Sequence, residues 1–440
     1  MKNKILYSII FVAISASYLV AQTWQSYTTE NSSLPDNFIR SIAVAQDSAV
    51  WVATDSGLAV FKDNAWKVFD TGNGLSGNQL KFISFQQTIP PKLWVGTNNG
   101  VTILNINSAN DIIDYEYINQ ANDSILSNTV LAVALDTLAS SWIGTDMGLS
   151  VITDSGIYNF NEENGFENSY VNTLKLMPDN WVHVGTAGGG VSRLKYNGVD
   201  AVTAASRIIS KWSGLASDSV FDAYITDDTL RWYATTQGVS THHGLDTKDI
   251  NNWWIYNTYT SNIIDNYVRS IIRDKDGNMW FGTRSGISEL SADKSTWQSY
   301  TEADGLVSNN IFDIKIDKDN NFWIATDSGL SKLTITSSAI AENNYSQPES
   351  FDIHPAYPNP FNMSTTIRFQ MYKLSSIKIS VYDINGRLVN TILNSNLMPG
   401  TYKVNWNGKD SKGEDISSGV YFAVVKSSDF VSTLKLVVIK

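Results

Sequence analysis

The chain has 440 residues and a formal net charge of −11 at pH 7, with 17% charged residues and no cysteine. Its 14 Trp, 20 Tyr and 28 Gly favour many short strands and tight turns over helices. Because no basic stripe is present, we expect no nucleic-acid partner. Without cysteine, the chain can form no disulfide and can carry no cysteine-linked lipid anchor.

The first residues are typical of a secretory signal peptide. Lys2 and Lys4 precede an apolar stretch that runs from Ile5 to Val20 and is followed by the small residue Ala21. We expect a signal peptide at residues 1–22, cut after Ala21 or Gln22. A membrane anchor is the alternative, but the apolar stretch is short for a span. The mature protein is therefore expected to lack a transmembrane segment, after export through the periplasm.

A ten-residue motif then recurs seven times, at intervals of 41 to 49 residues. The copies begin at Trp51 (WVATDSGLAV), Trp94 (WVGTNNGVTI), Trp142 (WIGTDMGLSV), His183 (HVGTAGGGVS), Trp232 (WYATTQGVST), Trp280 (WFGTRSGISE) and Trp323 (WIATDSGLSK). This period is that of a four-stranded propeller blade.

Each repeat predicts four strands. An aliphatic residue stands 12 positions before the motif in six copies, and Leu80 stands 14 before Trp94; the six are Ile39, Val130, Val171, Val220, Val268 and Ile311. This near-constant offset predicts an inner strand joined to the motif strand by a short hairpin. The glycine of the motif predicts a turn into a third strand. An aromatic fourth strand is expected at Trp66, Tyr117, Phe160, Trp212, Trp254 and Trp297.

One hexapeptide, TWQSYT, stands at residues 23–28 and again at 296–301. The seventh repeat lacks a fourth strand after residue 335, and residues 23–28 precede the first inner strand. We therefore predict an all-β, seven-bladed propeller over residues 23–335 that closes by strand exchange, with 23–28 beside 329–335. This closure covers two sheet edges.

The motif copies resemble the two-component-regulator propeller repeat, whose signature is a W-I-G-T-x-x-G-L string. The resemblance implies a ligand-binding propeller, and in that family such propellers are typically the extracytoplasmic sensing part of hybrid histidine kinases. The residues after 335 show neither a transmembrane span nor a kinase, so signalling by phosphorelay is not expected.

The tail begins with a polar segment, residues 336–350, which predicts a linker. YPNPFN follows at 357–362, then SIKISVYDINGRLV with an Asn385–Gly386 turn and PGTYKVNWNGKDSKGEDISSGVYF. About seven short strands in residues 351–440 predict a small β-sandwich.

These tail motifs resemble the type IX secretion sorting domain, in its variant with a flagellar-hook-capping-like immunoglobulin fold. The residues that carry the resemblance are Pro358, Asn359, Pro360, Gly386, Gly419, Tyr421 and the ending from Lys435 to Lys440. The resemblance implies that residues 351–440 engage the type IX secretion machinery. It also implies an extracellular or outer-surface location, usually with later removal of the tail.

The tail is mildly basic, so the negative charge belongs to the preceding residues. An acidic surface outside the cell favours solubility first and cation binding second.

No catalytic motif is present: we find no P-loop, no H-E-x-x-H and no G-x-S-x-G. We therefore predict no catalytic residue, no cofactor and no metal site.

His183 takes a motif Trp position and is expected in the core, whereas His242 and His243 are expected as a solvated pair in a loop. The runs at 274–278 and 317–321 resemble part of a calcium loop but lack its distal Glu, so hairpin turns are expected. The motif Trp residues are expected to pack between blades.

The loops that enter the inner strands should share one face with the T-x-x-G turns. A polar residue stands two positions before each aliphatic landmark, and its side chain predicts a turn cap; the seven are Asn37, Asn78, Asn128, Ser169, Asp218, Asn266 and Asn309. The next position varies between repeats. Where it is aromatic, at Phe38, Tyr170 and Tyr267, we predict candidate ligand contacts, with ordinary packing as the alternative.

Two classes of function follow. The first is a secreted, non-catalytic protein that binds an extracellular glycan, peptide or protein through a propeller face. The alternative is a secreted polysaccharide lyase or glycosidase, which would require acidic or His, Tyr and Arg groups that converge at one mouth.

Overall fold

The computed structural model describes residues 20–439, except for 87, 89–90, 137–139, 178–180, 198–201, 205–208, 227–229, 244–251, 338–350, 372–374, 399 and 428–430. Most of the predicted signal peptide, most of the predicted linker and Lys440 lie outside the described residues. Over the described part, no helix is both long and apolar enough to cross a membrane.

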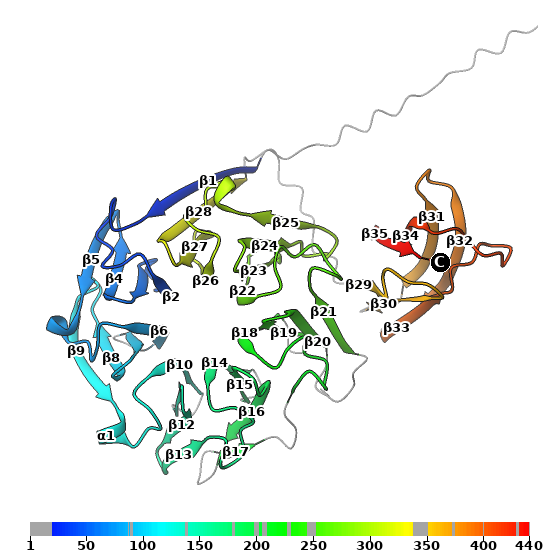
Figure 1. Ribbon diagram of the computed structural model, residues 1–440. Helices are drawn as coiled ribbons and strands as arrows, with labels where there is room; N and C mark the ends of the chain where they lie inside the picture. Colours follow the sequence, from blue (N-terminus) through cyan, green and yellow to red (C-terminus); the bar gives the residue numbers. More distant parts are fainter. Residues whose placement is uncertain are drawn as a thin grey trace, which may run out of the picture.

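Residues 20–337 form seven four-stranded antiparallel sheets that stand around a ring (Figure 1). We number the sheets one to seven by their inner strands: β2 (Ile39–Val44), β6 (Leu80–Gln86), β10 (Val130–Leu135), β14 (Val171–Leu176), β18 (Val220–Ile225), β22 (Val268–Arg273) and β26 (Ile311–Ile316). Each inner strand begins at the aliphatic residue found from the sequence. Consecutive inner strands contact each other, and β26 contacts β2, so the ring is closed.

The motif strands come second in each sheet: β3 (Val50–Thr54), β7 (Lys92–Thr97), β11 (Ser141–Thr145), β15 (Val182–Thr186), β19 (Leu230–Thr235), β23 (Met279–Thr283) and β27 (Asn321–Thr326). The third strands are β4 (Gly57–Lys62), β8 (Gly100–Ile106), β12 (Gly148–Thr153), β16 (Val191–Tyr196), β20 (Gly238–His243), β24 (Ile287–Leu290) and β28 (Leu330–Ser337).

The outer strands of sheets one to six are β5 (Ala65–Phe69), β9 (Ile112–Ile118), β13 (Gly156–Phe160), β17 (Val202–Ala204), β21 (Trp253–Tyr256) and β25 (Trp297–Tyr300). Three single helical turns precede inner strands: η1 (Thr71–Asn73), α1 (Gln120–Asp123) and η3 (Glu302–Asp304).

The T-x-x-G turn has one hydrogen-bond pattern throughout the ring. In sheet six, the Thr283 hydroxyl donates to the Gly286 carbonyl at 2.7 Å, and the same bond recurs in five other sheets. In sheet four the turn is one residue longer, and Thr186 donates to the Gly190 carbonyl. Gly286 has a φ of 122°, and a Cβ there would lie 2.4 Å from the Tyr300 carbonyl oxygen. Glycine is therefore required on both conformational and steric grounds.

The N-terminal strand β1 (Val20–Tyr27) is the outer strand of sheet seven. It pairs antiparallel with β28, from Tyr27 opposite Leu330 to Val20 opposite Ser337 (Figure 1). β25, which carries the second TWQSYT, has the same place in sheet six, and the Gln22 amide donates to the Tyr300 hydroxyl at 3.1 Å. Closure by strand exchange is thus confirmed. The pairing also extends two residues into the predicted linker.

The motif Trp side chains pack between neighbouring sheets. Trp280 is fully buried. Its ring centroid lies 4.2 Å from that of Phe322 in sheet seven and 5.3 Å from that of Tyr300. Its indole N–H donates to Asp274 at 2.9 Å, and that carboxylate also accepts the backbone N–H groups of Asp276 and Asn278. Asp317 and Trp323 repeat this arrangement. Both Asp-rich runs are hairpin turns that orient a Trp.

Two local predictions are wrong. Trp212 is not in an outer strand: it lies in a turn and is 79% exposed, because the outer strand of sheet four is Val202–Ala204. His242 and His243 are not in a loop. They end β20, where His242 pairs with Arg231 on one side and Trp253 on the other and is fully buried.

His183 lies in the core, as expected. It is 2% exposed and its Nδ1 lies 3.0 Å from the Tyr233 hydroxyl. Burial, together with the positive charges of Arg231 and Arg193, holds the pKa of the imidazole well below its usual value.

Residues 351–438 form a two-layer β-sandwich. One sheet contains β29 (Phe351–Tyr357), β30 (Thr365–Met371) and β33 (Gly400–Trp406); the other, in order, β32 (Leu388–Leu397), β31 (Ser375–Asp383), β34 (Gly419–Lys426) and β35 (Val431–Val438). Phe369, Ile377, Trp406 and Leu436 lie in the core between the sheets.

Candidate functional site

The segments that enter the inner strands and the T-x-x-G turns lie on one face of the ring, which we call the front face. Side chains join the two in several sheets; for example, Ser56 donates to Asp36 at 2.8 Å, Ser285 to Asp265 at 2.8 Å, and the Asn310 amide to Asp327 at 2.7 Å. The predicted common face is confirmed.

The predicted turn caps are present in all seven sheets. The side chain two positions before each inner strand accepts a backbone N–H seven or eight residues earlier, where the preceding outer strand has ended. The acceptors are Asn37, Asn78, Asn128, Ser169, Asp218, Asn266 and Asn309. These polar side chains fix the loops of the front face, and their acceptor atoms are used by the protein itself.

A β-bulge follows at the start of every inner strand. In sheet one, Ile39 pairs with Thr54 and Ser41 with Ala53, which leaves Arg40 as the extra residue. The shift recurs at the same position in the other six sheets. A bulge leaves its extra residue unpaired and can redirect that side chain. The bulged residues are Arg40, Lys81, Leu131, Asn172, Phe221, Arg269 and Phe312.

Six side chains from sheets five, six, seven and one form a continuous row on the front face, which we call the rim. The rim is Phe221, Tyr267, Arg269, Phe312, Phe38 and Arg40. Neighbouring ring centroids lie 5.0 Å apart for Phe221 and Tyr267 and 4.9 Å apart for Phe312 and Phe38. The Arg269 guanidinium lies 4.3 Å from the Phe312 centroid, and that of Arg40 lies 4.4 Å from Phe38. Each contact is within the range of ring stacking or cation–π attraction.

The charges on the rim are unequally compensated. Arg40 forms a two-bond ion pair with Asp55, at 2.6 and 2.9 Å. Arg269 donates to Asn310 and to the Ile311 carbonyl, both neutral acceptors. Burial lowers the pKa of Arg269, and the positive charge of Arg284 lowers it further.

Two of the three predicted ligand residues, Phe38 and Tyr267, belong to the rim. Tyr170 lies before sheet four, is 43% exposed and makes no ring contact with the rim over the described residues. Sequence reasoning missed two more exposed aromatic side chains, Trp212 and Tyr259. Each follows the residue whose N–H is capped, at equivalent turns before sheets five and six, and Tyr259 is 85% exposed. The equivalent positions of Trp212 and Tyr259 in the sequence repeat could have identified both as exposed turn residues.

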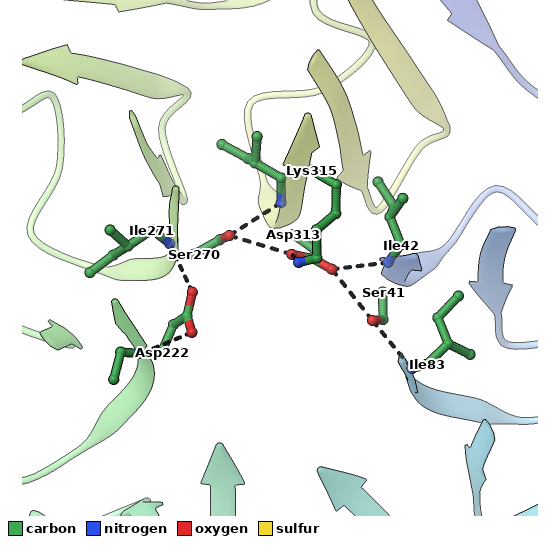
Figure 2. A network of polar contacts seen from close by, with 10 residues as sticks. Ser41, Ile42, Ile83, Asp222, Ser270, Ile271, Asp313 and Lys315 are labelled. Atoms are coloured by element: carbon green, nitrogen blue, oxygen red, sulfur yellow. Dashed lines mark hydrogen bonds and ion pairs between the residues drawn. The ribbon is translucent and has the colours of Figure 1, made fainter. Parts of the chain in front are cut away.

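Behind the rim, a second row of hydrogen bonds crosses from sheet to sheet (Figure 2). In four sheets, the residue after the bulge accepts a backbone N–H of the next sheet: Asp222 from Ile271 at 2.9 Å, Ser270 from Ile314 at 3.2 Å, Asp313 from Ile42 at 2.9 Å and Ser41 from Ile83 at 3.3 Å. Sheets five, six, seven, one and two are thereby joined in sequence around the axis.

The carboxylates of this row face lysines. Lys315 lies 2.5 Å from Asp313, and although burial opposes it, Asp313 and Asp222 raise the pKa of Lys315. Burial raises the pKa of Asp222 even though Lys175 and Lys315 oppose the change. Both carboxylates accept backbone N–H groups, so their main role is structural.

A cavity of about 510 Å³ lies beside these groups, where the inner strands end. Its lining includes the apolar side chains of Phe82, Phe85 and Val133 and the charged side chains of Lys175, Asp222 and Lys315.

In the sandwich, several of the predicted sorting residues lie next to the last strand. The Asn359 amide donates to the Lys435 carbonyl and its oxygen accepts the Val437 N–H, both at 2.7 Å. Phe361 extends this contact by bonding to Val437 and Ile439. Asn359, with Pro358 and Pro360 beside it, thus fastens β35.

The other sorting residues support the same sheet. Gly386 has a φ of 76° in the turn between β31 and β32, and Gly419 begins β34 opposite Val438. The Tyr421 hydroxyl donates to the Ser417 carbonyl at 2.9 Å, and its ring packs on Trp406.

Comparison with known families confirms both resemblances. Residues 355–440 match the secretion system C-terminal sorting domain, and residues 262–285 and 305–328 match the two component regulator propeller. The protein is therefore a secreted or cell-surface propeller protein with a C-terminal sorting domain. No curated protein sequence matches the chain.

Solved propellers share the fold. The chain is similar to the extracellular domain of a protein described as a hybrid two-component system of B. thetaiotaomicron, with a TM-score of 0.57, 18% identity, and 94% of this chain and 57% of that one covered. It is also similar to PorZ, a surface component of the type IX secretion system of Porphyromonas gingivalis (TM-score 0.51, 18% identity, 92% and 60% covered). The chain is also similar to streptogramin B lyase, with a TM-score of 0.53 and 14% identity, and 73% of this chain and 100% of that one are covered. The chain spans less than two thirds of the first two proteins, and at these identities the likeness concerns the fold.

Proposed function

We propose that this protein is a secreted, non-catalytic binding protein that recognises an extracellular ligand on the front face of its propeller. The rim carries the proposal: aromatic and guanidinium groups from four sheets form one row there. The rim residues occupy positions that vary between repeats, while the caps and the T-x-x-G turns around them repeat in all seven sheets. Variation within a rigid frame is the usual arrangement of a recognition surface.

The carboxylates near the axis support binding over catalysis. A glycosidase needs two carboxyl groups that are free to exchange a proton or attack a sugar. Asp313 is held by the Ile42 N–H and Lys315, and Asp222 by the N–H groups of Ala223 and Ile271.

The experiment is a panel of neutral polysaccharides, acidic polysaccharides and peptides, tested with the full chain for both retention and product release. We expect retention of at least one class without product, and weaker retention by the Phe38→Ala and Tyr267→Ala variants. Product release would instead favour the lyase or glycosidase. Retention that both variants leave unchanged would contradict a role for the rim.

A further inference from the structure

We propose that the front face binds an acidic polysaccharide, with a carboxylate of the polymer held by Arg269 and Arg284 beside Tyr267. This inference rests on the proposed function and names its ligand class. The site includes one residue outside the rim, Arg284, which comes from the T-x-x-G turn of sheet six.

Two guanidinium groups share the ring of Tyr267. The Cζ atom of Arg284 lies 3.5 Å from the ring centroid, and that of Arg269 lies 4.9 Å from it. Within the described residues, neither group has a carboxylate at ion-pair distance. The ring and the Asn310 amide hold Arg269 in place, while Arg284 is exposed at the surface.

The other sheets show why this pair is unusual. The residue after the motif threonine is Asp55 in sheet one, where it neutralises Arg40, and Asp327 in sheet seven, where it binds Ser308 and Asn310. In sheet six that position is Arg284, so a second cation stands where a carboxylate or a neutral residue stands in the other six.

Two like charges that share one ring repel each other, and an anion between them converts that repulsion into attraction. Planar guanidinium groups suit a carboxylate because both partners are flat and can form paired hydrogen bonds. The chain as a whole carries a formal net charge of −11, so an acidic polymer is repelled by most of the surface and is attracted where cations have no carboxylate at ion-pair distance.

Exposed aromatic rings favour a saccharide over an acidic protein segment. Tyr170, Trp212 and Tyr259 lie on the segments that enter sheets four, five and six, and Trp212 and Tyr259 are mostly exposed. A flat aromatic face offers a surface for the apolar C–H face of a sugar ring. Together, the three rings and the arginine pair cover consecutive sheets, as an extended polymer requires.

The test uses the full chain and polygalacturonate, with its methyl-esterified form as the uncharged match. Chondroitin sulfate tests whether the site prefers sulfate groups, and poly-glutamate tests whether it binds acidic protein segments. We expect polygalacturonate to bind best and to be released as salt is raised, because exposed charges are screened. Esterification, Arg269→Gln or Arg284→Gln should each weaken binding by about tenfold or more, the effect of losing a charge-assisted hydrogen bond.

Lys92→Gln is the matched control. It removes one positive charge at the start of β7, at the opposite end of that strand from its T-x-x-G turn, where Lys92 pairs with Glu116. This variant should bind polygalacturonate as the unmodified chain does. Because Arg284 is exposed, Arg284→Gln should melt at the unmodified temperature, which separates lost binding from lost folding.

Other results would overturn the inference. If the free and the esterified polymer bind equally, and Arg284→Gln changes neither, the arginine pair does not hold the ligand. The proposed function is then left intact. Preference for chondroitin sulfate would contradict the assignment of a carboxylate as the bound group. Binding of poly-glutamate alone would contradict a polysaccharide and indicate an acidic protein partner. If no probe binds while a neutral polysaccharide or peptide is retained, this inference fails alone; if nothing is retained, the proposed function fails with it.

Discussion

The Asp313 carboxylate accepts the backbone N–H of Ile42 at 2.9 Å, although the two residues stand 271 positions apart. The bond joins the inner strands of the last and the first sheet, whereas the exchanged strand β1 forms the outer edge of the last sheet. The same carboxylate meets Lys315 at 2.5 Å and Ser270 of sheet six at 3.4 Å (Figure 2). One side chain thus joins three neighbouring inner strands.

We expect Asp313→Ala to lower the free energy of unfolding by about 1–3 kcal/mol, since it leaves the Ile42 N–H without its acceptor. Urea denaturation of the full chain measures this change. The double variant Asp313→Ala/Lys315→Met should be less destabilised than the single one, because it also removes the stranded ammonium group. An unchanged free energy in Asp313→Ala would contradict the structural role of the bond.

Removal of residues 23–28 should lower the melting temperature by several degrees and promote aggregation. It exposes the edge of β28 and strips Tyr27 from Phe61, Trp66 and Trp323. Calorimetry and light scattering check both effects. A melting curve like that of the intact chain would show that closure by β1 adds no stability.

Trp280→Ala or Trp142→Ala should cost on the order of 3–5 kcal/mol, because each side chain is fully buried and leaves a cavity. Trp212→Ala is the control: that side chain is 79% exposed, and its removal should change stability by less than about 0.5 kcal/mol. If Trp280→Ala kept its stability and lost ligand retention, Trp280 would be a ligand contact rather than a packing residue.

Stability should fall as the pH drops below about 6.5, the usual pKa of histidine, in part because of His183. Burial lowers the pKa of His183 in the folded state, so below that pH the unfolded chain takes up a proton that the folded chain excludes. The loss is at most about 1.4 kcal/mol per pH unit and ends at the folded-state pKa.

The measurement is the free energy of unfolding at pH 7 and pH 5 in the unmodified chain and in His183→Phe. The variant is expected to be less stable at pH 7, since it loses the bond to Tyr233, but to depend less on pH. An equal pH dependence in both proteins would assign the effect to other groups.

The mature protein should lack about the first 21 residues and the sandwich beyond the linker at 336–350. The linker is polar and rich in Ser and Asn, a composition that favours an open chain accessible to proteases. Intact-mass analysis of protein recovered outside the cell checks both ends. A secreted species that retains Lys440 would contradict removal of the tail.

Export itself should depend on the sandwich and on its last strand. A chain that ends at Ser337 keeps every propeller strand and should remain in the periplasm. Asn359→Ala should reduce export, because Asn359 fastens β35 through two 2.7 Å bonds. Asn394→Ala, at an exposed position of β32, is the control. Export of the shortened chain would mean that the tail is not a sorting signal.

Local sequence determined the strands and their turns. Each inner strand begins at the aliphatic landmark, such as Ile39 or Val268, and each cap, such as Asn266, binds a backbone group at most eight residues away. Such contacts depend on short-range geometry, which repeats with the motif. The repeated TWQSYT also gave the closing strand, because equivalent strands need equivalent side chains.

Other features were decided only by the tertiary structure. Trp212 was predicted in an outer strand, but it follows the residues that pair with β16, which are Val202–Ala204 and Ile209. His242 is buried in β20, which pairs with a strand on each side. The rim and the bond from Asp313 to Ile42 join residues of different sheets. Residue spacing fixes the geometry within a repeat, whereas the distance between repeats depends on how the sheets pack around the axis.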